Sequence, residues 1–102
     1  MATADIDIII EKVTDKSIRE PNKFKVLIFN DNVTTVEFVI VLLMTVFKHT
    51  QASAIELTQK VHNEGKAVAG VYSHEIAEQK VFEAESLSQL NEFPLVIRMQ
   101  PE

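Results

Sequence analysis

The sequence predicts a two-layer α/β sandwich of the α+β kind, in which three helices cover one face of a three-stranded antiparallel sheet. Two observations lead to this fold class. Strand and helix patterns follow one another in the order β-α-α-β-α-β. If the chain reverses direction at each connection, the second and third strands run in the same direction and the first strand is antiparallel to both. The first strand, with Val26 to Phe29 in one run, is also the most continuously apolar of the three. A central first strand gives the order 2-1-3.

The chain has 102 residues, enough for one core but not for two. Residues 23–102 form the predicted core domain, and residues 1–22 form an N-terminal extension. Within the extension, Asp5 to Ile10 alternate weakly, and Arg19 to Asn22 give a turn or linker signal. Two interpretations stay open: a mobile or extended arm, or an additional strand.

In the first half of the core, a strand is expected from about Lys23 to Phe29. It should end at Asn30, because Asn and Asp side chains bond to nearby backbone and suit strands poorly. A helix is expected over 34–48, with Thr34 as its N-cap and Glu37 completing a capping box. Its apolar residues lie on two sides, so both must be covered.

The second half of the core alternates helices and strands. A second helix is expected from Thr50 until Gly65 supplies a left-handed stop. A strand over 67–72 leads to Ser73, the predicted N-cap of a helix that runs to about 91. The last strand, 95–99, lies between two prolines.

Composition excludes several classes of function. The net charge of −5, with no basic cluster, argues against nucleic-acid binding. The chain has no cysteine, which excludes disulfides, Fe–S clusters and Cys-type zinc sites. The longest apolar run, 39–47, is far shorter than the roughly 20 residues that cross a bilayer. The first residues resemble neither a signal nor a transit peptide. We expect a cytoplasmic protein without a membrane partner, or an organellar one if a transit peptide was removed.

Three polar residues, Asn30, Asp31 and Asn32, interrupt the chain between the first strand and the first helix. Such a cluster commonly shapes a turn, and the alternative is the polar rim of a ligand site. His62 is predicted near the carboxyl end of the second helix, beside this corner if the first two helices are antiparallel. An inward His alone is more often a core residue. Together, however, these acceptors around an apolar floor suit an ammonium, which only donates, such as a protein's free amino terminus.

Other chemistry is poorly supported. The run His74-Glu-Ile-Ala-Glu78 resembles a zinc-binding helix, but its last ligand is Glu and no third ligand is evident. A helix start with acids near its positive end explains it better. His49 is expected to contact the carbonyl end of the first helix. Paired catalytic carboxylates and a nucleophile–His arrangement are absent, so we expect no enzyme, no metal and no cofactor.

Three ordered motifs resemble the ClpS family. They are Val-Leu-Ile-Phe-Asn-Asp-Asn-Val-Thr-Thr-Val-Glu-Phe-Val from Val26, Val61-His62 followed by Glu64-Gly-Lys-Ala-Val-Ala-Gly-Val71, and Glu75-Ile-Ala-Glu-Gln-Lys80. The resemblance covers about residues 23–99. It implies an adaptor that binds N-degrons, which are free N-termini with a bulky hydrophobic first residue. The adaptor delivers them to a ClpA- or ClpC-type unfoldase of the ClpP protease. It also implies the fold of the ribosomal stalk protein's C-terminal domain.

The resemblance assigns roles by position. The substrate α-amine would be held by Asn30, Asp31 and His62, with Asn32 and Thr34 at the rim. The apolar side-chain pocket would comprise Ile28, Val36, Val39, Thr58, Val61 and Leu95. The unfoldase would dock at Tyr72, Glu75 and Lys80, and residues 1–22 would engage it during delivery.

This chain departs from the family's usual pattern at three of these positions. Asn32 stands where Asp is usual, and Val36 and Thr58 stand where Met is common. We therefore hypothesise that Val36 admits β-branched or bulkier first residues. The alternative function is an interaction domain of the ribosomal-stalk kind without an amine pocket, with a small hydrolase third. His62 together with the polar corner separates the first two, because the stalk interpretation gives these residues no role.

Overall fold

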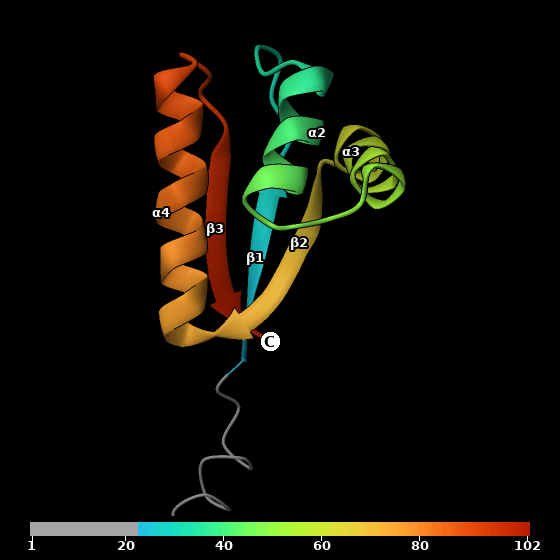
Figure 1. Ribbon diagram of the computed structural model, residues 1–102. Coiled ribbons are helices and arrows are strands. Elements are labelled where there is room, and N and C mark those ends of the chain that lie inside the picture. Colours follow the sequence, from blue (N-terminus) through green and yellow to red (C-terminus); the bar gives the residue numbers. More distant parts are fainter. Residues whose placement is uncertain (1–22) are drawn as a thin grey trace, which may run out of the picture.

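The computed structural model describes residues 23–102, and the strand and helix order is the predicted one. Figure 1 shows the arrangement, with the sheet backed by helices along its length. The predicted arm or extra strand in residues 1–22 lies outside the described residues. The elements are β1 Lys23–Phe29, α2 Val36–Thr45, α3 Gln51–Glu64, β2 Lys66–Ser73, α4 His74–Leu90 and β3 Val96–Pro101.

The sheet confirms the predicted order, β2-β1-β3, with both neighbouring pairs antiparallel. In the register, Ile28 of β1 lies between Ala67 of β2 and Ile97 of β3. A bulge between Val26 and Leu27 shifts the pairing with β2. The apolar run of β1 thus forms the middle of the sheet, as its composition predicted.

The helices pack on one face of the sheet. In Figure 1, α2 and α4 lie along the sheet, and α3 lies beside α2 at the β2 side. Buried side chains from all six elements and the segment before β3 form one core. The largest fully buried core side chains are those of Val26, Ile28, Leu42 and Leu43.

The start of α2 corrects the sequence prediction. Thr35, not Thr34, is the N-cap, and its hydroxyl accepts a hydrogen bond from the Phe38 N–H at 3.2 Å. The predicted capping box of Thr34 and Glu37 is wrong because the Thr34 hydroxyl donates to the Asp31 carboxylate instead. Thr35 therefore caps the helix, and Thr34 shapes the corner before it.

The end of α2 also differs from the prediction. The helix stops at Thr45 instead of continuing to residue 48. The Lys80 ammonium, from α4, donates to the carbonyl of Val46 at 2.8 Å. A cation is stabilising near the negative, C-terminal end of a helix. The last turn of α2 contains no basic residue of its own.

His49 does not contact the end of α2 with its side chain as predicted. Its Nε2 bonds to the Ala69 carbonyl of β2, and its Nδ1 lies 3.0 Å from the Ser53 hydroxyl. Only its backbone N–H reaches α2, at the carbonyl of Leu43. The imidazole therefore ties the α2–α3 connection to the sheet.

The remaining boundaries agree with the sequence to within a residue or two. Gly65 ends α3 in the left-handed conformation, with φ of 89°, as predicted. Ser73 occupies the N-cap of α4, although its side chain makes no capping hydrogen bond. Across residues 23–102, no helix combines the length and the apolar character needed to cross a membrane.

Candidate functional site

The corner between β1 and α2 is shaped by the Asp31 side chain. Its Oδ1 accepts hydrogen bonds from the backbone N–H groups of Val33, at 2.8 Å, and Thr34, at 2.7 Å. Its Oδ2 accepts from the Thr34 hydroxyl at 2.6 Å. An aspartate that bonds to backbone two and three residues onward is the usual means of closing such a turn. The turn interpretation of this cluster is thus confirmed for Asp31.

The same contacts keep this carboxylate charged. Partial burial alone would raise the pKa of Asp31, but the hydrogen bonds from the Thr34 hydroxyl and the two backbone N–H groups outweigh it. The pKa of Asp31 is therefore lowered from its ordinary 3.8. Because a carboxylate has about four lone-pair positions, one remains beyond the three in use, and the negative charge persists beside the pocket.

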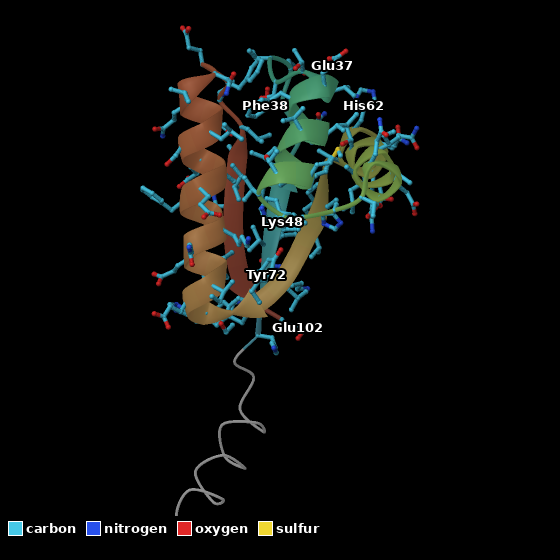
Figure 2. All side chains as sticks on the ribbon, viewed as in Figure 1. Glu37, Phe38, Lys48, His62, Tyr72 and Glu102 are labelled. Carbon is cyan, nitrogen blue, oxygen red and sulfur yellow. The ribbon has the colours of Figure 1, made fainter. Side chains whose placement is uncertain are left out.

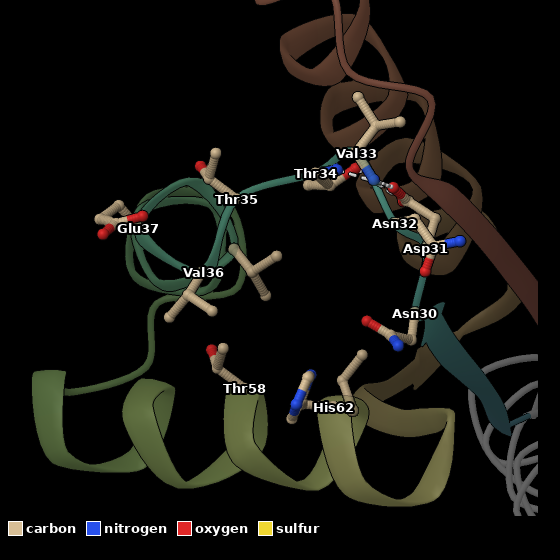
Figure 3. Close-up of a pocket in the computed structure, with 12 residues that line it drawn as sticks. Asn30, Asp31, Asn32, Val33, Thr34, Thr35, Val36, Glu37, Thr58 and His62 are labelled. Carbon is tan, nitrogen blue, oxygen red and sulfur yellow. Dashed lines mark hydrogen bonds between the residues drawn. The ribbon is translucent and has the colours of Figure 1, made fainter.

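A backbone hydrogen bond brings the end of α3 to this corner. The Asn30 N–H donates to the carbonyl of Gly65 at 2.8 Å. His62 lies about one turn before that glycine, so its ring is held near the Asn30 side chain. Figure 3 shows the Asn30 amide and the His62 ring directed toward the same space. His62 is exposed, not sealed in the core as an inward-facing His commonly is.

The space between the corner, α2 and α3 is an open pocket of about 520 Å³. Figure 3 shows Val36 and Thr58 directed toward each other, across the pocket from Asn30. Val39 and Val61, both buried, supply an apolar floor. The lining residues are Asn30, Asp31, Asn32, Val33, Thr34, Thr35, Val36, Glu37, Val39, Thr58, Val61 and His62.

Two residues assigned to this pocket by position do not line it. Ile28 and Leu95 are buried core residues and are not among the residues that line the pocket. Conversely, sequence reasoning missed Val33, Thr35 and Glu37, which do line the pocket. Their continuity with the polar corner was the only signal that could have found them.

The chemistry of the lining is that of an acceptor-rich rim over an apolar floor. Asn30 contributes an amide oxygen, Asp31 a negative charge and His62 a ring nitrogen, and no Lys or Arg is among the lining residues. The Thr58 hydroxyl donates to the carbonyl of Ala54 at 2.7 Å. Its proton is thus used within α3, so the Thr58 oxygen can only accept hydrogen bonds from a ligand. The arrangement fits a cationic group attached to an apolar side chain.

The three predicted docking residues lie elsewhere. In Figure 2, Tyr72 lies toward the end of the molecule opposite His62. The Lys80 ammonium lies 5.9 Å from the centroid of the Tyr72 ring, and burial raises the pKa of the Tyr72 hydroxyl. Glu75 is exposed in the first turn of α4. These residues form a second surface, separate from the pocket.

The His74–Glu78 pair at the start of α4 is the part of the chain that resembles a zinc-binding helix in sequence. The His74 Nδ1 lies 3.8 Å from the Glu78 carboxylate, and both side chains are exposed. Residues 23–102 contain no group of three or more His, Cys, Asp or Glu side chains that could hold a metal ion.

Comparisons with known proteins identify a family that matches most of this chain. The model of the family described as ATP-dependent Clp protease adaptor protein ClpS matches residues 19–98. The ClpS adapter of Acetivibrio thermocellus is 40% identical over 94 residues, covering 92% of this chain and 95% of that protein. The ClpS adapter of Myxococcus xanthus is 39% identical over 98 residues, covering 96% and 92%.

A solved structure is also similar. Agrobacterium tumefaciens ClpS2 bound to L-phenylalaninamide is 36% identical, with a TM-score of 0.78 over 81% of this chain and 100% of that chain. The family model, the relatives and the solved structure each match most of the chain. The chain therefore belongs to the family of the ATP-dependent Clp protease adaptor protein ClpS.

Proposed function

We propose that this protein is an adaptor that binds proteins by a free amino terminus with an apolar first residue and delivers them to a ClpA- or ClpC-type unfoldase. It performs no catalysis itself. The observation that carries the proposal is the pocket in which Asn30, Asp31 and His62 surround an apolar floor. Delivery requires the protein and the Clp protease to share a compartment, which we expect to be the cytoplasm.

The rim suits an α-ammonium group. The Asn30 amide oxygen and a neutral His62 nitrogen accept two of its three protons, and the charged Asp31 carboxylate lies beside them. The Agrobacterium relative was solved with L-phenylalaninamide, which combines a free α-amine with a benzyl side chain. A ligand of this kind matches both parts of the pocket described here.

The energies are consistent with a reversible adaptor. Each hydrogen bond to a charged amine contributes about 1.5–3 kcal/mol. Burying a large first side chain over Val39 and Val61 contributes about 1.5–3 kcal/mol more. After the cost of association, affinities of about micromolar are expected. A protein that must release its cargo to an unfoldase needs no tighter binding.

Val36 and Thr58 set which first residues are accepted. Both are smaller than the Met that is common at these positions in the family, and they face each other at one side of the pocket. Removing this volume leaves room for β-branched or bulkier first side chains. We expect peptides beginning with Ile or Val to bind here alongside those beginning with Leu or Phe.

Tyr72, Glu75 and Lys80 are the proposed contacts with the unfoldase. They lie away from the pocket, so cargo and unfoldase can be bound at once. The exposed Glu75 carboxylate is available to a partner. The Lys80 ammonium is already bonded to Val46, so substituting Lys80 would also disturb the end of α2.

The test is a set of short peptides identical except for the first residue, measured by fluorescence anisotropy. Leu-, Phe-, Ile- and Val-leading peptides should bind, an Asp-leading peptide should not, and acetylating the amine should abolish binding. Equal binding of the acetylated Leu-leading peptide would overturn the proposal.

Val36→Met is the matched variant for selectivity. It restores side-chain volume at an exposed position and should weaken the Ile- and Val-leading peptides more than the Leu-leading one. If all four peptides respond alike, Val36 does not determine selectivity.

A further inference from the structure

A second hollow lies between α2 and α3, on the outer side of the pocket. It encloses about 350 Å³ and is lined by Val36, Ile40, Ile55, Thr58, Gln59, His62 and Asn63. This size is within the range of about 300–1,000 Å³ found for ligand pockets. We call it the outer groove.

The outer groove presents apolar surface to solvent. Val36 is 52% exposed and Ile55 is 38% exposed, and each lies on a helix that buries other residues in the core. Gln59 and Asn63 add uncharged amides at the rim, and no Asp, Glu, Lys or Arg is among the lining residues. An uncharged, aliphatic side chain is the ligand that such a surface fits.

The groove is continuous with the pocket. Val36, Thr58 and His62 line both hollows, so these three side chains form a ridge with the pocket on one side and the groove on the other. The amine-binding His62 belongs to that ridge. A peptide whose amine is held there and whose first side chain fills the pocket therefore has its backbone at the ridge.

Extended peptides place successive side chains on opposite sides, about 3.3 Å apart along the chain. With the first side chain on the pocket side of the ridge, the second is directed to the groove side. We propose that the outer groove is a subsite for the second residue of the bound peptide and favours an aliphatic side chain. This inference rests on the proposed function and adds a second determinant of cargo choice.

The test uses peptides that all begin with Leu and differ only at the second residue, which is Leu, Val, Ala or Asp. Partial burial of an aliphatic side chain should make the Leu-Leu peptide bind about three- to tenfold more tightly than Leu-Ala. Ile55→Asn should remove this difference while leaving the affinity for Leu-Ala unchanged.

Ile76→Asn is the matched control variant. Ile76 is 42% exposed, similar to Ile55, but lies on α4 and lines neither hollow. It should leave the Leu-Leu preference intact, and circular dichroism should show both variants folded.

The outcomes separate the two proposals. If Leu-Ala binds but the second residue makes no difference, the groove assignment is overturned and the proposed function stands. If Ile55→Asn and Ile76→Asn reduce the preference equally, the groove is not its source. If no Leu-leading peptide binds, the proposed function fails and this inference fails with it.

Discussion

Two histidines, one before the start of α3 and one near its end, are in opposite circumstances. Just before α3, His49 has both ring nitrogens engaged, by Ser53 and by the Ala69 carbonyl. Near its end, His62 is exposed at the pocket, and no described residue forms a hydrogen bond with its ring. The first imidazole is committed to the fold, and the second keeps its hydrogen-bonding capacity. Candidate function is thus indicated by unused capacity, not by residue type.

Substituting each histidine should produce opposite effects, and this is the largest expected difference. His62→Ala should weaken binding of a Leu-leading peptide about 10- to 100-fold, the loss of one hydrogen bond to a charged group. Because the His62 side chain is exposed, the substitution should alter the free energy of unfolding by less than about 0.5 kcal/mol.

His49→Ala should do the reverse. Leaving the part-buried Ala69 carbonyl without its donor should cost about 1–3 kcal/mol of stability, with peptide affinity unchanged. Anisotropy titrations and urea denaturation of both variants measure the two quantities. The distinction between the two ends of α3 fails if His49→Ala weakens binding as much as His62→Ala does.

Asp31 should make stability depend on pH only in acidic buffer. Its folded-state pKa is lowered from the ordinary 3.8, so its stabilising effect is present above the unfolded value and is lost only as pH falls through the lower folded value. Denaturation midpoints of the wild type and Asp31→Asn should therefore differ above about pH 4 and converge in more acidic buffer. A constant difference down to the acid-unfolding region would contradict this role.

Gly65 joins the end of α3, where His62 lies, to the corner that contains Asn30. It ends α3 with φ of 89°, and its carbonyl accepts from Asn30. An added Cβ would meet nothing within 4 Å, so Gly65→Ala should cost only the left-handed strain of about 1–2 kcal/mol. Gly65→Asn should cost less, since Asn tolerates this conformation. Thermal unfolding of the two variants checks the order, and equal losses would point to a cause other than backbone strain.

Periodicity and strand composition were sufficient to predict the fold, because they reflect burial directly. The apolar run of β1 predicted a central strand, and Gly65 predicted the end of α3. The corner could not be resolved in the same way. Thr34 and Thr35 are both competent caps, and their roles depend on which hydroxyl Asp31 reaches. Likewise, Ile28, Leu95, Val39 and Val61 are all buried core residues. Only Val39 and Val61 border the pocket, and positional resemblance does not show this difference.

The threonine pair gives the smallest expected effect and separates the corner from the helix. Thr35→Val removes the hydroxyl that accepts from the Phe38 N–H and should cost about 1 kcal/mol of stability, with little effect on peptide binding. Thr34→Val instead removes the 2.6 Å bond to Asp31, so it should loosen the corner and weaken binding as well. Because both changes keep side-chain volume, only the lost hydrogen bond differs between them. If Thr35→Val weakened binding more than Thr34→Val, the corner would owe its shape to the helix start and not to Asp31.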